Sequence, residues 1–194
     1  MAKKQTLSGG QIALIVVGVI VLFSIIWFVS SYNGLIKSDE TINEKWANVQ
    51  SAYQRRADLI PNVVETVKAY SDYEGEVLTQ LTEARASVGR ASTPAQLDSA
   101  SADLNSALAR LLVVVENYPN LKANENYLSL QDELAGTENR IKVERDIFNA
   151  AVKDFNIRVR RFPTAIIANM FSFETKESFQ ADEGAEVAPQ IDFS

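Results

Sequence analysis

The fold is decided by the stretch LIKSDETINEKWANVQSAYQRRADLIPNVVETVKAY, which runs from Leu35 to Tyr70. Apolar residues recur in it at steps of three and four, and this spacing places them on one face of an α-helix. They are Ile42, Trp46, Val49, Tyr53, Ile60, Val63, Val64 and Val67. We expect the later helices of the chain to pack against this face.

A proline, Pro61, lies inside this helical pattern. Proline lacks a backbone N–H and its ring clashes with the preceding turn, so we expect the helix either to kink or to turn between Asp58 and Pro61. A second break is indicated at Ser71-Asp72-Tyr73-Glu74, which matches a capping box. The residues leave both positions open.

An uncharged apolar segment, IALIVVGVIVLFSIIWFV, precedes this helix from Ile12 to Val29. About 18 residues rising about 1.5 Å each cover the hydrocarbon core of a bilayer. Trp27 and Tyr32 stand where an interfacial aromatic belt lies. We interpret residues 12–30 as a transmembrane helix after a short polar N-terminus, residues 1–11. The alternative is a cleavable signal peptide, for which Val29-Ser30-Ser31 is a weak cleavage site.

Three more amphipathic helices are predicted after Tyr70. The first contains Val77, Leu78, Leu81, Ala84 and Val88 and ends near residues 89–92. The second begins at Thr93-Pro94-Ala95-Gln96, with Thr93 as N-cap, and ends at residues 117–120. The third begins between residues 123 and 126 and ends at Phe162-Pro163. Its apolar stripe is Tyr127, Leu130, Leu134, Ile141, Phe148, Val152, Phe155, Val159 and Phe162.

Short connections between long helices favour antiparallel neighbours. We therefore predict an all-α protein, with the transmembrane helix followed by an antiparallel up-and-down bundle of about four long helices in residues 31–173. The apolar patch from Thr164 to Phe173 either caps the bundle or lies in the membrane interface, and its lack of a basic face favours capping. Residues 174–194 are acidic and are predicted to be a flexible tail.

Composition excludes several classes of site. The chain has no cysteine and no histidine, which excludes disulfides, the common zinc sites, Cys–His and Ser–His–Asp catalysis, and a di-iron centre of the usual Glu-x-x-His type. A net charge of -6 argues against nucleic acid as a partner. No Gly-rich phosphate loop is visible. We expect no catalytic residues, no metal, no cofactor and no enzymatic activity.

Four charged residues, Arg55, Arg56, Glu138 and Arg145, lie on or beside the apolar stripes and form a candidate interhelical polar site. Arg56 follows Tyr53 by three residues and precedes Ile60 by four, and Glu138 continues the stripe of the last helix in the same way. One interpretation, which we favour, is an ion pair that sets the register of the helices. The other is a site that recognises an anionic group or a peptide.

Three stretches resemble the bacterial LemA family. They are RRADLIPNVVETVKAY from Arg55 to Tyr70, NYPNLKANENYLSLQDELAGTENRI from Asn117 to Ile141, and the closing FP…IANMFSF between Phe162 and Phe173. The similarity covers the whole chain, including the N-terminal anchor. It implies a membrane-anchored, all-helical protein, and it assigns no chemical role to Arg56 or Glu138.

Self-association is expected from the run Leu111 to Val115, which is apolar all round and favours burial on more than one side. A wide core at that level is the alternative. Confinement to one membrane raises the effective concentration of neighbouring copies. We therefore predict a homo-oligomer, with this helix or the Thr164 to Phe173 patch at the contact.

These observations predict a non-enzymatic, single-pass scaffold or adaptor in the cell membrane. It contacts lipid through the N-terminal helix, binds a second copy of itself, and is open to a further protein partner. The alternative function is a binding or sensor module with its site around Arg56 and Glu138. A filled core would favour the scaffold, and a polar cavity at those two residues would favour the sensor. Lys3 and Lys4 favour a cytoplasmic N-terminus and a bundle on the extracytoplasmic side.

Overall fold

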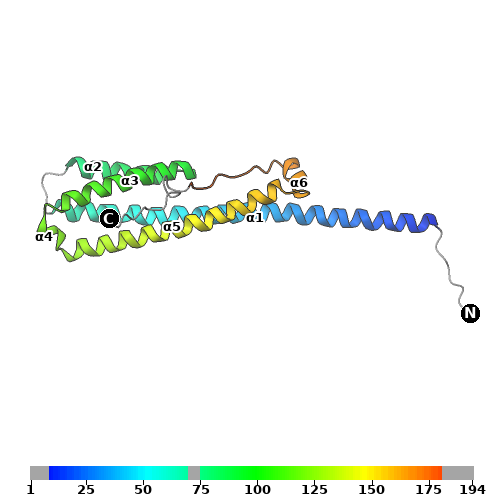
Figure 1. Cartoon of the computed structure of the whole chain (residues 1–194), viewed down its shortest axis with the longest axis horizontal. Coiled ribbons are helices and arrows are strands. Elements are labelled where there is room, and N and C mark those ends of the chain that lie inside the picture. Colours follow the sequence, from blue (N-terminus) through cyan, green and yellow to red (C-terminus); the bar gives the residue numbers. More distant parts are fainter. Residues whose placement is uncertain (1–8, 70–74, 181–194) are drawn as a thin grey trace, which may run out of the picture. The chain divides into compact units, whose positions relative to one another are not determined.

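A computed structural model describes residues 9–69 and 75–180, and every regular element in these residues is an α-helix (Figure 1). The prediction of an all-α fold is confirmed. The helices are α1 (Gly9–Lys68), α2 (Gly75–Arg90), α3 (Pro94–Val115), α4 (Pro119–Lys122), α5 (Glu125–Arg160) and α6 (Thr164–Met170). Four of them, α1, α2, α3 and α5, are long, which agrees with the predicted bundle.

The chain forms two compact units. The first comprises Met1–Thr41 and Lys153–Lys176, and so contains the start of α1, the end of α5 and all of α6. The second comprises Ile42–Val152 and Glu177–Ser194, and contains the rest of α1 and α5 together with α2, α3 and α4.

The core of the second unit is built from the predicted apolar stripes. α2 and α3 lie side by side, joined by a short connection at residues 91–93 (Figure 1). The buried apolar side chains include Ile42, Val49, Tyr53, Ile60, Val63 and Val67 of α1, Leu78, Leu81, Ala84 and Val88 of α2, Leu97, Leu104, Leu111 and Val115 of α3, and Tyr127, Ile141, Phe148 and Val152 of α5. Burial of these residues is the main stabilising contribution to the fold.

α1 continues through Pro61 and ends at Lys68, so the chain does not turn at the proline. Pro61 has no N–H to donate to the carbonyl of Ala57, four residues earlier. Nε of Arg85, from α2, donates a hydrogen bond to this carbonyl at 2.9 Å. The arginine thus satisfies a backbone acceptor that the proline leaves without its helical partner. The second predicted break, at Ser71 to Glu74, lies outside the described residues.

Local signals set the starts of α3 and α5 as predicted. Oγ1 of Thr93 accepts a hydrogen bond from the backbone N–H of Gln96 at 3.2 Å, and Pro94 is the first helical residue. The side chain of Gln96 reaches back and accepts from the N–H of Ser92, one residue before the N-cap. α5 begins with Asn124 accepting from the N–H of Tyr127 at 3.1 Å. Both helices therefore begin where a side chain satisfies a first-turn N–H.

The first unit contains the apolar span. α1 is the one helix in the described residues that is long and apolar enough to cross a membrane. Ile12 to Val29 are exposed along their length except for Phe28, which is half-buried. α6 buries Ile167 and Ala168 and exposes Ile166 and Met170. Capping of the unit therefore accounts for only one face of the predicted apolar patch.

Two details of the C-terminal part differ from expectation. The sequence pattern predicts Phe162 on the stripe of the last helix, but α5 ends at Arg160, before it, and Phe162 is 77% exposed. The predicted flexible tail starts at Glu174, yet residues 174–180 form an ordered extended segment, which we call the strap. Its Lys176 exchanges two backbone hydrogen bonds with the side chain of Asn156, at 2.8 and 2.9 Å. Residues 181–194 of the predicted tail lie outside the described part.

Candidate functional site

Arg56 and Glu138 form an interhelical ion pair in the second unit, between Nη1 of the arginine and Oε2 of the glutamate. Arg56 is buried because its place on the α1 stripe, between Tyr53 and Ile60, faces the core. The two ends of the pair are unequally covered, since the side chain of Arg56 is 8% exposed and that of Glu138 is 52% exposed. The pair therefore lies at an edge of the bundle.

The donors of Arg56 are incompletely satisfied. Nη1 is in contact with the Glu138 carboxylate, whereas Nε is buried and has no hydrogen-bond partner. A buried guanidinium group is costly unless its N–H groups are bonded. A further anionic acceptor beside Nε would therefore be stabilised by this buried guanidinium group.

A groove of about 450 Å³ opens beside Arg56. Its walls come from α3 and α5 and are largely apolar. They include Leu108, Ala109, Leu111 and Leu112 of α3, and Tyr127, Leu130, Leu134 and Ala135 of α5, with Val63 and Arg56 from α1. Asn105, Gln131 and Glu138 add polar groups. A mainly apolar concavity with a few polar groups at one place is the usual form of a binding site.

Arg145 belongs to a different cluster. Its Nη2 pairs with Oδ1 of Asp98 on α3 at 2.9 Å and donates to the carbonyl of Gln180 at 3.3 Å. Its guanidinium carbon lies 4.6 Å from the ring centroid of Phe179. Cation–π contact and ion pairing together join α3, α5 and the end of the strap. The structure thus gives Arg145 partners other than Arg56 and Glu138.

Phe179 anchors this end of the strap. Its ring is buried, stacks on Trp46 of α1 at a centroid distance of 6.0 Å and meets Phe148 of α5 edge-on at 5.5 Å. Asn149 holds its backbone, accepting from the Phe179 N–H at 2.9 Å and donating to its carbonyl at 3.2 Å. Sequence reasoning missed these partners because strap and helix meet only in the folded chain.

Tyr53 is buried close to Arg145. Burial raises the pKa of the Tyr53 phenol above its ordinary value, and the positive charge of Arg145 acts in the opposite direction. Burial also raises the pKa of Tyr127 in the groove wall. Loss of a proton is disfavoured in both cases because the tyrosinate charge would have to be taken out of water.

Arg55 does not belong to the groove beside the Arg56–Glu138 pair. It is exposed and lines a second groove, of about 350 Å³, between α1 and α5. Glu133, Gly136, Thr137 and Arg140 line the α5 side of this groove. The four residues of the predicted polar site are therefore found in three places, and only Arg56 and Glu138 meet.

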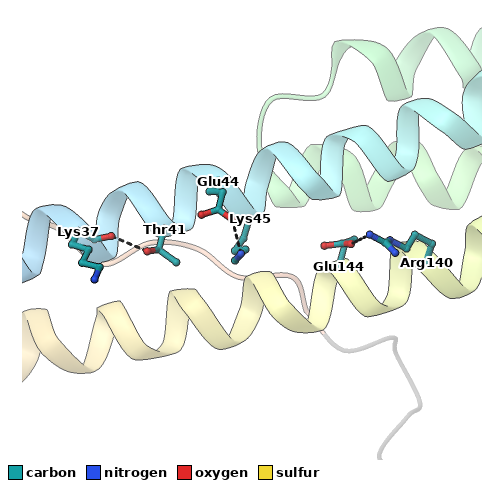
Figure 2. Close-up of polar contacts among 6 residues, drawn as sticks. All are labelled: Lys37, Thr41, Glu44, Lys45, Arg140 and Glu144. Atoms are coloured by element: carbon teal, nitrogen blue, oxygen red, sulfur yellow. Dashed lines mark hydrogen bonds and ion pairs between the residues drawn. The ribbon is translucent and has the colours of Figure 1, made fainter.

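Glu144 and Thr137 are buried polar residues that sequence reasoning did not single out. Glu144 pairs with exposed Arg140 at 2.7 Å along α5, whereas Lys45 on α1 forms its own pair with neighbouring Glu44 (Figure 2). The Thr137 hydroxyl donates to the carbonyl of Leu134 at 2.7 Å. The signal was available, because both residues lie at stripe positions on either side of Ile141. No group of three acidic residues in the described ranges is arranged to hold a metal ion.

The chain is similar to known proteins along most of its length. Residues 45–193 match the LemA family. The magnetosome protein MamQ 2 of Paramagnetospirillum magneticum is 24% identical over 89% of this chain and 76% of its own length. MamQ of Magnetospirillum gryphiswaldense is 23% identical over 82% and 70%, and protein LemA of Metamycoplasma hominis is 25% identical over 80% and 72%. Since the family match covers more than half of the chain, this protein belongs to the LemA family.

Proposed function

We propose that this protein is a non-enzymatic adaptor, anchored in the cell membrane by the start of α1, that binds a partner in the groove between α3 and α5. The groove beside Arg56 is the observation that carries the proposal. A fully filled interior would have favoured a purely structural scaffold.

The chemistry of the groove suggests an amphipathic helix with an acidic residue as its occupant. The apolar walls lie on two neighbouring helices, α3 and α5, an arrangement that accepts the apolar face of a third. A carboxylate from the partner would give Nε of Arg56 the hydrogen bond that it lacks. Glu138 is half exposed, so it could turn into solvent at little cost when the partner arrives.

Photo-crosslinking in intact membranes tests this proposal. A photoreactive amino acid at Leu112, in the groove, should capture a partner that the same group at Val143, exposed elsewhere on α5, does not. Ala109→Trp would fill the groove while leaving Arg56 in place, and it should abolish capture. Arg56→Gln should reduce the amount of partner captured from Leu112. Equal capture from both positions, or capture that persists with Ala109→Trp, would refute the groove as the binding site.

Self-association is a second candidate function. Val113 is large, apolar and exposed on α3, next to Leu112 of the groove wall, which supports a lateral contact between copies. Anchored copies share one orientation, so weak contacts suffice. The adaptor would then be a homo-oligomeric scaffold. Its topology is proposed from Lys3 and Lys4, with the bundle on the extracytoplasmic side.

A further inference from the structure

The depth of α6 relative to the apolar span is defined inside the first unit. The ring of Phe171, which follows α6, lies 6.1 Å from that of Phe28 and 4.5 Å from that of Tyr32, measured between centroids. Phe28 is next to the end of the uncharged span, and Tyr32 follows one helical turn later. If the span crosses a bilayer, the end of α6 must therefore lie where hydrocarbon meets headgroups.

The turn after α6 maintains these contacts. Ser172 has φ 56°, the left-handed conformation that ends many helices. The N–H of Phe173 bonds to the carbonyl of Ala168 at 2.9 Å, and that of Ser172 to Asn169 at 3.4 Å, which is the pattern of a Schellman motif. The chain reverses as a result, and the Phe173 ring also packs on Tyr32 and Phe155, at 6.2 and 6.4 Å.

α6 has apolar side chains on two faces. Ile167 and Ala168 are buried against the rest of the first unit. Ile166 and Met170 are four residues apart on α6 and share its outward face, where they are 54% and 62% exposed. Phe162, in the turn that precedes α6, is 77% exposed. Water is an unfavourable environment for such a face, and Phe171, which follows α6 directly, contacts Phe28 at the end of the apolar span.

Basic residues accompany this face. Arg158, Arg160 and Arg161 are exposed at the end of α5 and lead directly into Phe162. The segment Lys153 to Lys176 has five basic and two acidic residues, in a chain whose net charge is -6. Positive charge is thus concentrated next to the outward apolar face, which complements a surface of anionic lipid. The arginines of α5 supply the basic component that α6 itself lacks.

We propose that Phe162 and α6 lie in the interface of a bilayer that contains anionic lipid, as a second membrane contact besides the span. Phe162, Ile166 and Met170 insert among the first acyl carbons, about 5–10 Å below the headgroups. Arg160 and Arg161 bind lipid phosphates. The bilayer is the favoured occupant because Phe171, one residue beyond α6, contacts Phe28 at the end of the span, so a second copy or another protein would have to cover this face beside lipid.

The absence of cysteine allows a direct test on the full-length protein in nanodiscs. A single cysteine is introduced by Met170→Cys, or independently by Ile166→Cys, and labelled with an environment-sensitive fluorophore. Ser106→Cys, at an exposed position of α3 in the other unit, is the matched control. In discs containing phosphatidylglycerol, the labels at 170 and 166 should emit at shorter wavelength and lose intensity with lipids spin-labelled near the headgroup. The label at 106 should do neither.

The lipid requirement is tested with the same labels. Emission should shift back toward that of the control in discs of phosphatidylcholine alone, and also when Arg160→Gln and Arg161→Gln are combined in phosphatidylglycerol discs. Labels at 170 and 166 that behave like the label at 106 would overturn the proposal. So would a blue-shifted label that spin-labelled lipid fails to quench, because protein would then cover the face. Equal immersion in both lipids would overturn the assignment to anionic lipid.

Discussion

Arg56 is buried in the second unit, whereas Glu138, its ion-pair partner on α5, is half exposed at the edge of the groove. Removing one partner is therefore not equivalent to removing the other. Without Glu138 the buried guanidinium loses its counter-charge, but without Arg56 the carboxylate is left largely in water. The stability of the unit should depend on which residue is changed.

We expect Glu138→Gln to lower the free energy of unfolding by about 1–3 kcal/mol, since it leaves a buried cation unpaired. Arg56→Met, which replaces the arginine by an apolar chain of similar length, should cost less than about 1 kcal/mol. The double substitution should resemble Arg56→Met. Denaturant unfolding of the full-length protein in detergent measures this, with Trp27→Phe as background so that Trp46 alone reports. An Arg56→Met cost equal to that of Glu138→Gln would contradict the asymmetry.

The hydrogen bond from Arg85 to the Ala57 carbonyl should matter only because residue 61 is proline. We expect Arg85→Met to cost about 1 kcal/mol of unfolding free energy in the native sequence. With Pro61→Ala the helix supplies its own N–H to Ala57, so the cost of Arg85→Met should fall by about half or more. A double-mutant cycle under the same unfolding conditions gives the coupling. Additive effects would show that the arginine does not compensate for the proline.

Alkaline pH should destabilise the fold through Tyr53. Its pKa is raised in the folded state, mainly by burial, so the unfolded chain releases the phenol proton first. The stability contributed by the protonated phenol is fully present below the unfolded pKa of about 10 and is lost as pH rises through the folded pKa. Tyr53→Phe should show a smaller decrease in stability between about pH 9 and pH 11. Burial also raises the pKa of Tyr127, so Tyr127→Phe should independently reduce the loss of stability at alkaline pH.

Topology is tested by protease treatment of sealed spheroplasts. With the N-terminus in the cytoplasm, as Lys3 and Lys4 indicate, the bundle is accessible and should be degraded. Detergent lysis provides the control for intrinsic sensitivity, and a cytoplasmic protein provides the control for sealing. Survival of the bundle in intact spheroplasts together with its loss after lysis would place it inside the cell.

Self-association predicts a species larger than the monomer when detergent-solubilised full-length protein is measured by mass photometry. Val113→Lys should reduce that species, because it places a charge on the exposed part of α3. Val143→Lys, at an exposed valine of α5, should leave it unchanged. A monomer in detergent that is also a monomer by crosslinking in the native membrane would leave a different protein as the partner.

Local signals determined most of the helical architecture. Steps of three and four placed Ile42 to Val67 on the buried face of α1, and the Thr93 and Pro94 pair marked the start of α3. These predictions succeeded because helix periodicity and capping depend on residues within a few positions of one another. The uncharged span from Ile12 to Val29 was predictable because its length and apolar composition are also local properties of the sequence. Pairing of Arg56 with Glu138 was also anticipated, since both continue an apolar stripe.

Only the tertiary structure decided which neighbours contact these stripes and how exposed each residue on them is. Glu138 is half exposed because α3 and α5 leave a groove beside it, and the width of that groove depends on side chains from three helices. Arg145 pairs with Asp98, and Asn149 holds Phe179, across separations of many residues along the chain. Residues 174–180 look like a flexible tail in the sequence because their partners lie on α1 and α5, many residues earlier in the chain. Periodicity assigns a residue to a face of its helix, but the neighbours that cover this face are set by packing between helices.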